Sequence, residues 1–429
     1  MSREQHVAVI GGGIIGIASA HFLSERGYRV TVVDQGSIGG ACSHGNCGLV
    51  SPSHILPLAQ PGMLGSSVAE SLRQDSALRI GWRLDWSFLK WMWRFASRCN
   101  QSDMLQSAGA IHPLLVESKR LYDKLVSSDG LACEWQSRGL MFVYRDRVAF
   151  DRSAEEVRVM EDQFGHRTER VESKDLLERE PSLRRDLAGA WYHNTDAHLR
   201  PDRLINSWVA RLKRSGVRFV ERTRWLHLQD ESNRRTSAGL VRSAVLKCEQ
   251  ADAVDSLQAD HFVIATGAWT PKWDSALGVR IPIEPGKGYS VMLPRPDRCP
   301  SVPMIFPQEH VAVTPMKSGL RLGSMMEFVG YDRSIDPDRI EFLRRGAAKY
   351  LVAPLPESHE SPWFGWRPMT IDSTPVIGAC PGFKNVVLAA GHNMLGLSMA
   401  PATGRIVADL ISGRASADEI HRYRADRLI

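Results

Sequence analysis

Three glycines near the start of the chain have the spacing of a phosphate-binding turn. Gly11, Gly13 and Gly16 form a Gly-x-Gly-x-x-Gly pattern that follows one apolar stretch and opens another. In such a turn the first glycine permits a sharp bend, the second lets the backbone approach a pyrophosphate, and the third lets helix and strand pack closely. Asp34 follows at a distance where a carboxylate would accept hydrogen bonds from ribose hydroxyl groups. These residues therefore predict a dinucleotide site.

A later apolar stretch favours FAD over a nicotinamide cofactor. It runs Phe-Val-Ile-Ala-Thr-Gly-Ala-Trp from Phe262 to Trp269. In flavoproteins with two dinucleotide-type domains, a late strand of this kind lies beside the first strand, and its turn at Thr266 and Gly267 passes close to the FAD. A buried strand that ends in an unrelated glycine turn is the alternative.

The elements that must position these residues can be predicted from periodicity. Apolar runs and alternating patterns predict strands at 7–10, 29–33, 139–144, 217–220 and 261–265. Helical spacing predicts helices at 14–26, 78–128, 151–164, 173–179 and 202–215. Residues 286–330 alternate as in an antiparallel sheet. The predicted fold class is α/β, with a Rossmann-like FAD-binding domain interleaved with an antiparallel-sheet substrate domain.

Length, charge and cysteine content limit the choice of class. The 429 residues suffice for two domains, which we place at 1–55, 145–275 and 360–429 for FAD and at 56–144 and 276–359 for the substrate. The net charge of +6 is too small to indicate a nucleic-acid partner. The 7 cysteines are scattered without a Cys-x-x-Cys pair, so we expect neither a metal site nor disulfides, and a reducing, cytoplasmic location.

Five motifs, in order along nearly the whole chain, resemble those of the D-amino-acid oxidase superfamily, and within it those of the bacterial D-amino-acid dehydrogenases. The motifs are Cys-Ser-His-Gly-Asn-Cys-Gly-Leu-Val-Ser-Pro at 42–52, Leu-Lys-Trp-Met-Trp at 89–93, Gly-Lys-Gly-Tyr-Ser at 286–290, Gly-Trp-Arg-Pro-Met-Thr-x-Asp-x-Thr-Pro-Val-Ile-Gly at 365–378, and Gly-His-x-x-Leu-Gly-x-x-Met-Ala at 391–400. The resemblance implies an FAD-dependent oxidoreductase fold for the whole chain.

The resemblance also implies roles for single residues. Arg367 occupies the position whose guanidinium pairs with the substrate carboxylate, which suits the planar and permanently charged side chain. Tyr289 is expected to reach the substrate, with a packed position in the sheet as the alternative. His392 is expected near the flavin, either as a general base or with its ring bonded to backbone or flavin. The residues expected to contact FAD are Gly11, Gly13, Ile14, Ile15, Gly16, Asp34, Gln35, Ser43, Asn46, Gly48, Leu49, Thr266, Gly267, Trp269, Gly391, His392, Leu395, Gly396 and Leu397.

Four positions depart from the related families. Family dehydrogenases usually carry tyrosine at His54, alanine at Cys47 and glycine at Asn393, all near the expected flavin or substrate pocket. His54 is therefore a further candidate for substrate contact, and the substrate itself stays open. Met369 stands near Arg367, where the sarcosine-oxidase branch has the cysteine that holds flavin covalently, so noncovalent FAD is implied.

The implied activity is oxidation of an amino or imino acid by hydride transfer from Cα to flavin N5, which gives an imine and then a 2-keto acid. A D-amino acid is the expected substrate, including cyclic ones such as D-proline or hydroxy-D-proline, and a quinone or another carrier is the expected electron acceptor. An N-methyl-amino-acid or 2-hydroxy-acid dehydrogenase on the same scaffold is one alternative. A non-catalytic flavin-binding subunit is another.

One stretch has an unusual density of aromatic and basic residues, which predicts peripheral contact with the inner face of the cytoplasmic membrane. Such contact would bring the enzyme close to a quinone. Ordinary core packing of the aromatic rings is the alternative. The residues are Trp82, Trp86, Phe88, Trp91, Trp93 and Phe95, interleaved with Arg79, Arg83, Lys90, Arg94 and Arg98.

Overall fold

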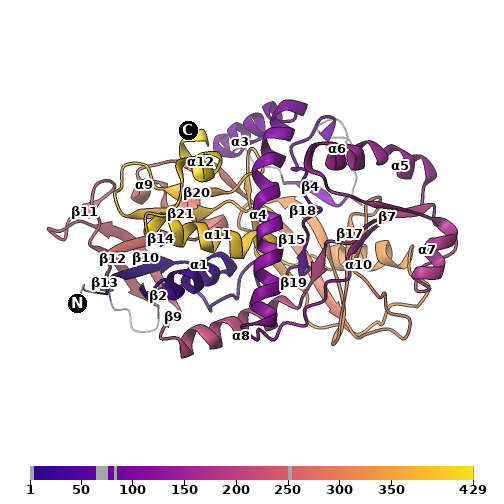
Figure 1. Ribbon diagram of the computed structural model, residues 1–429, viewed down its shortest axis with the longest axis horizontal. Coiled ribbons are helices and arrows are strands. Elements are labelled where there is room, and N and C mark those ends of the chain that lie inside the picture. Colours follow the sequence, from indigo (N-terminus) through magenta and orange to yellow (C-terminus); the bar gives the residue numbers. More distant parts are fainter. Residues whose placement is uncertain (1–3, 64–75, 82–84, 250–253, 429) are drawn as a thin grey trace.

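The computed structural model describes residues 4–63, 76–81, 85–249 and 254–428. Two large sheets lie side by side, and the long helix α4 (Gln101–Ser127) runs across the junction between them (Figure 1). Within the described ranges, none of the helices combines the length and the low polarity that a membrane-spanning segment needs.

The first sheet has six strands in the order β20-β21-β14-β1-β2-β9 and is parallel except for β20. Its strands are β1 (His6–Ile10), β2 (Arg29–Val33), β9 (Arg218–Val220), β14 (His261–Ile264), β20 (Val376–Ala379) and β21 (Val386–Ala390). The sheet collects strands from the beginning, middle and end of the chain. The predicted assembly of the cofactor region from separated segments is therefore confirmed.

Both faces of this sheet are covered, which explains why its strands are continuously apolar. On one face Val7 and Val9 of β1 pack with the helical layer. On the other face Ala8 and Ile10 pack with a four-stranded antiparallel sheet. The helical layer consists of α4, α1 (Ile14–Glu25), α8 (Pro201–Arg214) and α11 (Gly396–Ile411). The small sheet consists of β10 (Thr223–Gln229), β11 (Arg235–Thr236), β12 (Ser243–Cys248) and β13 (Val254–Gln258).

The second large sheet has nine strands and is mainly antiparallel, with the order β19-β15-β18-β17-β16-β5-β7-β6 and with β4 paired to β18. These strands are β4 (Leu78–Ile80), β5 (Leu140–Tyr144), β6 (Glu169–Glu172), β7 (Gly189–His193), β15 (Ile283–Leu293), β16 (Met304–Phe306), β17 (Val311–Met316), β18 (Gly319–Phe328) and β19 (Trp363–Thr370). Helix α10 (Pro337–Ala348) packs on one face of the central strands, in a core that includes Val291, Leu322 and Val313.

Shorter elements connect and cap the two halves. They are the strands β3 (Leu49–Val50) and β8 (Ala197–His198), which pair with each other, the α-helices α3 (Trp86–Ser97), α5 (Arg147–Arg152), α6 (Ala154–Phe164), α7 (Ser173–Arg179), α9 (Asp274–Leu277) and α12 (Ala417–Ile420), and the 3-10 helices η1 (Gly267–Trp273), η2 (His421–Tyr423) and η3 (Ala425–Leu428).

Two expectations about the fold need correction. The helix predicted for 78–128 is wrong at its start, because residues 78–80 form β4, whose pairing with β18 leaves no local signal in the sequence. The predicted domain boundaries place 145–275 and 360–429 with the cofactor domain, yet β6, β7 and β19 pair into the nine-stranded sheet. We propose that these three strands belong to the substrate domain.

Candidate functional site

Two of the three motif glycines are required by the packing of the protein itself. Gly11 has a φ of +111°, and a methyl group there would lie 2.3 Å from the carbonyl oxygen of Ala265, at the end of β14. A methyl group at Gly16 would lie 1.9 Å from the carbonyl oxygen of Gly11. The first glycine therefore lets β14 approach the turn, and the third lets α1 pack on it.

Gly13 is different, because nothing in the protein requires a glycine there. Its φ of −71° is open to any residue, and it immediately precedes α1 without a side-chain cap for the helix. The nearest atom to an added methyl group would be Ser43 Oγ, at the ordinary contact distance of 3.5 Å. The space beside Gly13 adjoins the N-terminus of a helix, where backbone N–H groups favour phosphate. This arrangement fits the pyrophosphate of a dinucleotide.

Asp34 and Ser43 shape the loops around this helix N-terminus. The Asp34 carboxylate accepts hydrogen bonds from the backbone N–H of Gly12 and of Gly36, both at 2.7 Å. Burial raises the pKa of Asp34, and these two bonds counteract the shift. Ser43 Oγ accepts a hydrogen bond from the N–H of Ile14 at 3.0 Å. Contact between Asp34 and a ribose stays a prediction. In such a contact, the ribose hydroxyl groups would donate to the remaining lone pairs of the Asp34 carboxylate.

The turn after β14 connects the two large sheets. Gly267 has a φ of +55°, and Thr266 Oγ1 lies 3.0 Å from Thr270 Oγ1 inside η1. The ring of Trp269 lies edge-on to the ring of Trp366 of β19, with centroids 5.4 Å apart. The predicted cofactor residues 266–269 are therefore brought next to the strand that carries the predicted substrate arginine.

The 42–48 loop reaches the nine-stranded sheet. Cys42 Sγ donates a hydrogen bond to the carbonyl oxygen of Trp366 at 2.5 Å. The Asn46 side chain closes its own loop, since its Nδ2 donates to Ser43 O at 2.9 Å and its Oδ1 accepts from the N–H of Gly48 at 2.8 Å. The amide of Asn46 therefore shapes the loop, and only the loop as a whole stays a candidate for lining the flavin.

Arg367 lies on the face of β19 that this loop covers. Its Nη1 donates to the carbonyl oxygen of Met325 and its Nη2 to that of Ser324, at 3.3 Å for the second. A methyl group at Gly288 of β15 would lie 2.3 Å from Arg367 Nη1. The glycine of the Gly-Lys-Gly motif therefore makes room for the guanidinium, and two carbonyl groups fix its orientation.

No carboxylate of the described residues forms an ion pair with Arg367. Burial lowers the pKa of its guanidinium, as expected for a cation removed from water. The two cysteines that interact with it electrostatically, Cys42 and Cys47, are no substitute for a carboxylate. Burial raises the pKa of both thiols, to about 12 for Cys42. Arg367 is therefore a half-buried cation whose charge the protein does not neutralise, and it suits an anionic ligand.

Arg321 of β18 is a functional candidate that the sequence motifs did not single out. It is 6% exposed, and its Nη1 donates to the carbonyl oxygen of Asn46 at 2.8 Å. Its Nε has no hydrogen-bond partner among the described residues. Arg321 therefore places a second buried positive charge beside the 42–48 loop. An arginine among apolar neighbours, two positions before Gly323, was the available signal.

The side chain of Tyr289 does not point toward Arg367. Side chains alternate along β15, and Tyr289 therefore lies on the face opposite to the one where Gly288 meets Arg367. Its hydroxyl donates to Glu327 Oε2 at 2.6 Å, and its ring is buried in the core beneath α10. The alternative of a packed sheet tyrosine is the one that the structure supports.

His392 does not fit a general base either. Its ring is 2% exposed, and its Nε2 lies 3.0 Å from Thr403 Oγ1 in α11. Burial lowers its pKa to about 3, so the ring is neutral. A general base must reach the proton that it removes. The observed partner is a side-chain hydroxyl, so the ring supports the 391–396 turn, and contact of His392 with the flavin stays a prediction.

That turn is tied firmly to β19. Asn393 has a φ of +51°, a region that glycine and asparagine tolerate best, which explains how asparagine replaces the family glycine. Its Oδ1 accepts from the N–H of Thr370 at 2.8 Å, and its Nδ2 donates to Gly391 O at 2.9 Å. The N-terminus of α11, at Gly396, is thereby held at the end of the strand that carries Arg367.

His54 lies in a separate polar cluster, and no contact joins it to Arg367 among the described residues. Its ring centroid is 5.6 Å from that of Phe142, which in turn is 5.2 Å from that of His193. Ser53 donates its N–H and its hydroxyl to the buried Asp196. Burial lowers the pKa of His54 to about 4 and raises that of Asp196 to about 7. A role for His54 at the substrate stays a prediction.

The other predicted cofactor residues surround the same region. The side chains of Ile14, Ile15 and Leu397 are buried in the helical core. Only their backbone groups are therefore available at the N-termini of α1 and α11. Leu49 of β3 accepts a hydrogen bond from Ser398 Oγ at 3.0 Å, which ties β3 to the first turn of α11. Gln35 is half-buried directly after β2.

Known proteins are similar to this chain over its whole length. A family model described as FAD dependent oxidoreductase (DAO) matches residues 6–410. D-amino acid dehydrogenase of Paramagnetospirillum magneticum is 31% identical over 429 residues, which cover 98% of each chain. The solved structure of glycine oxidase from Bacillus cereus has a TM-score of 0.75 at 20% identity and covers 99% of this chain and 100% of its own. L-proline dehydrogenase from P. horikoshii has a TM-score of 0.72 at 20% identity, with 100% and 98% covered.

The matches cover both large sheets, whose strands lie within residues 6–410. They confirm the predicted fold class and the predicted cofactor. The chain therefore belongs to the DAO family of FAD-dependent oxidoreductases, and FAD is its cofactor.

Proposed function

We propose that this chain oxidises an amino or imino acid at the carbon that carries the nitrogen, and that a D-amino acid is its substrate. Arg367 carries this proposal, because a half-buried guanidinium with no acidic partner among the described residues is suited to a substrate carboxylate. The D-configuration is supported by relatives with about 30% identity over 95% or more of the chain, which are named D-amino acid dehydrogenases.

The residues of the chain supply binding and orientation. Arg367 would hold the carboxylate, and the carbonyl groups of Ser324 and Met325 keep its guanidinium fixed while it does so. When bound, FAD supplies the acceptor for the hydride that leaves Cα. Because Tyr289 and His392 are engaged elsewhere, neither is available to take the amine proton. We therefore propose that the substrate binds with a neutral amine, which a poorly solvated site favours.

The arginine alone does not distinguish an amine from a hydroxyl group at Cα. N-methyl-amino acids and 2-hydroxy acids carry the same carboxylate and stay alternatives. Structures with this fold include proteins named glycine oxidase, L-proline dehydrogenase and iminodiacetate oxidase, so the fold accommodates different substrates. A non-catalytic flavin-binding subunit would have no use for a half-buried arginine whose charge the protein does not neutralise, and we do not favour it.

Anaerobic bleaching of the flavin tests the proposal. The purified yellow protein is mixed without oxygen with D- and L-amino acids, D-proline, hydroxy-D-proline, sarcosine and 2-hydroxy acids, and the flavin absorbance is followed. We expect D-amino or D-imino acids to reduce the flavin at least tenfold faster than their L-enantiomers. Reduction by 2-hydroxy acids or sarcosine alone would support the alternatives, and failure of every compound to bleach the flavin would contradict the proposal.

We also propose that helix α3 contacts a membrane surface, where a quinone or another carrier would take up the electrons. Its aromatic residues divide between two faces. Phe88, Trp91 and Phe95 are buried in the core, as the packing alternative predicts. Trp86 and Trp93, however, are 85% and 71% exposed.

Leu89 and Lys90 add to this exposed face of α3. Exposed tryptophans beside a lysine favour the membrane interface. Arg94 and Arg98 are engaged with Leu428 O and Asp103, and Trp82 and Arg83 lie outside the described residues.

Flotation with anionic liposomes at low salt tests this contact. We expect the wild type to float and the Trp86→Ser, Trp93→Ser double variant to float several-fold less, because the variant loses the exposed rings. A Val148→Ser, Val254→Ser variant removes two other exposed apolar side chains and serves as the control. If the wild type does not float with the liposomes, α3 is not a membrane contact. The expected acceptor is then a carrier that is not in the membrane.

A further inference from the structure

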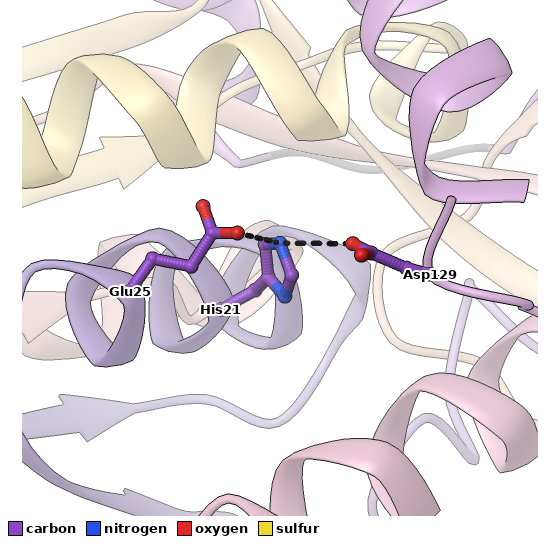
Figure 2. Close-up of side chains that lie close together, drawn as sticks. All are labelled: His21, Glu25 and Asp129. Atoms are coloured by element: carbon purple, nitrogen blue, oxygen red, sulfur yellow. Dashed lines mark ion pairs between the residues drawn. The ribbon is translucent and has the colours of Figure 1, made fainter. Parts of the chain in front are cut away.

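A histidine and two carboxylates meet at the far end of α1 from the phosphate-binding turn (Figure 2). His21 and Glu25 lie one turn apart on α1, and Asp129 follows α4. His21 Nε2 lies 3.5 Å from Glu25 Oε1 and 3.9 Å from Asp129 Oδ2. In the part of the chain that the structure describes, no other group of three histidine, cysteine or acidic side chains has its ligand atoms within 4.8 Å of one another.

The distances in this cluster do not correspond to hydrogen bonds. Both carboxylate oxygens are farther from the imidazole nitrogen than the 2.7–3.2 Å of a hydrogen bond. Two ligands at about 2.0–2.1 Å from a tetrahedral zinc ion lie roughly 3.3 Å apart. The separation of 3.5 Å is close to this value, and a small movement of Asp129 or of the half-exposed Glu25 would bring the third ligand into place.

Two of the three side chains are oriented by contacts outside the cluster. Arg211 of α8 pairs with Asp129 Oδ1 at 3.0 Å, which leaves Oδ2 directed toward His21. The His21 ring packs edge-on against Trp208, with centroids 5.6 Å apart, and against Phe22, with centroids 4.9 Å apart. A hydrogen-bonded ligating carboxylate, as Asp129 would be here, is a usual feature of metal sites.

The charges suit a divalent cation. Two carboxylates face one neutralising arginine, and Lys124 lies near enough to reduce the negative potential further. With Asp129 paired to Arg211, the carboxylate of Glu25 and the imidazole of His21 are the groups that would attract the ion. Imidazole nitrogen with carboxylate oxygen is a ligand set that zinc accepts.

We propose that His21, Glu25 and Asp129 form a binding site for a divalent transition-metal ion of the zinc type, with water completing the coordination. The ion would join α1 to the segment after α4 and act on stability. His21 is seven residues, roughly 10 Å, along α1 from Ile14 at the phosphate-binding end. The site is thus separate from the cofactor and from Arg367. The sequence predicted no metal site because its cysteines form no Cys-x-x-Cys pair, and this site uses no cysteine.

Zinc titration of the chelator-treated holoenzyme, free of any affinity tag, tests the proposal. Calorimetry and elemental analysis after gel filtration should give one zinc per chain for the wild type. Zinc should raise its Tm by several degrees, because an ion that binds only the native state stabilises it. Glu25→Gln should bind at least tenfold more weakly and lose the rise in Tm.

Asp123→Asn is the matched control, because it removes an exposed carboxylate that pairs with Lys119 at helical spacing and has no histidine beside it. This variant should bind zinc like the wild type. Flavin absorbance reports whether each variant is folded. Equal zinc content in the wild type and Glu25→Gln, or no bound zinc in either, would overturn the proposal and leave the cluster as an ion pair.

Discussion

Replacement of Arg367 by leucine lowers the catalytic efficiency with the preferred substrate by at least a hundredfold, and the variant keeps its FAD. The expected size follows from the roughly 3–5 kcal/mol lost when one member of a buried charge pair is removed, since each 1.36 kcal/mol is a factor of ten. FAD is retained because the glycine turn and α1 are connected to strands of the six-stranded sheet, whereas Arg367 lies in the nine-stranded sheet. Steady-state kinetics and the flavin spectrum measure both effects.

Substrate amides make this test specific for the carboxylate. The wild type should strongly prefer an amino acid over its amide, because the amide has no negative charge for Arg367. In Arg367→Leu this preference should collapse, so that the two substrates react with similar efficiency. Arg367→Lys should fall between, because lysine keeps the charge but cannot form the planar paired hydrogen bonds.

An exposed arginine between β15 and β16 provides the control. Arg298→Leu removes the same kind of side chain without touching the 42–48 loop or β19, and its kinetics should equal those of the wild type. If Arg367→Leu keeps the wild-type preference for acid over amide, Arg367 does not bind the carboxylate, whatever its overall activity.

Local patterns in the sequence predicted those parts of the fold that are determined by residues close together along the chain. The first βαβ unit was predicted correctly because glycine spacing and apolar runs act within some 30 residues. The strand at 78–80 was missed because the strand that it pairs with among the described residues is β18, far away in the chain. The pairing of β19 with β15, which sets the boundary between the domains, has the same long-range origin.

Among the candidate site residues, the sequence indicated which residues matter better than it indicated where their side chains point. The motif around Arg367 predicted an arginine that binds the substrate carboxylate, and this stays a prediction, supported by its lack of an acidic partner among the described residues. The motif around Tyr289 does not reveal on which face of β15 this residue lies. The alternation of side chains along the strand places it on the face that α10 covers. For His392, the decisive contact with Thr403 depends on the path of α11, which no local pattern specifies.

Gly13→Val should yield a folded protein that purifies without its yellow colour. A methyl group at Gly13 would meet no protein atom closer than 3.5 Å, so we expect the fold to tolerate valine, which fills the space where the backbone would approach the pyrophosphate. Gly109→Val adds the same bulk at a glycine of α4 with no atom within 4 Å, and this control should stay yellow. The measurement is the ratio of absorbance at 450 nm to that at 280 nm. This ratio should be roughly zero for Gly13→Val and equal to the wild-type value for Gly109→Val.

Substitutions at the three motif glycines should differ in their effect on the Tm of the protein, although all three glycines belong to one pattern. Gly16→Ala brings a methyl group within 1.9 Å of the Gly11 carbonyl, and such overpacking costs about 1–3 kcal/mol or more. It should therefore lower the Tm of the protein even without cofactor. Gly13→Val should instead unfold at the same temperature as wild-type apoprotein, since it lacks only the stabilisation that a bound ligand provides.

Acid precipitation provides the apoprotein for this comparison, because noncovalent FAD should leave the wild type and stay in the supernatant. Flavin that remains with the precipitated chain would contradict the noncovalent binding expected from Met369, whose side chain is buried in the core. A Gly13→Val protein that stays yellow would show that the pyrophosphate does not pass beside Gly13. A Tm well below that of the apoprotein would show that Gly13 serves the fold, as Gly11 and Gly16 do.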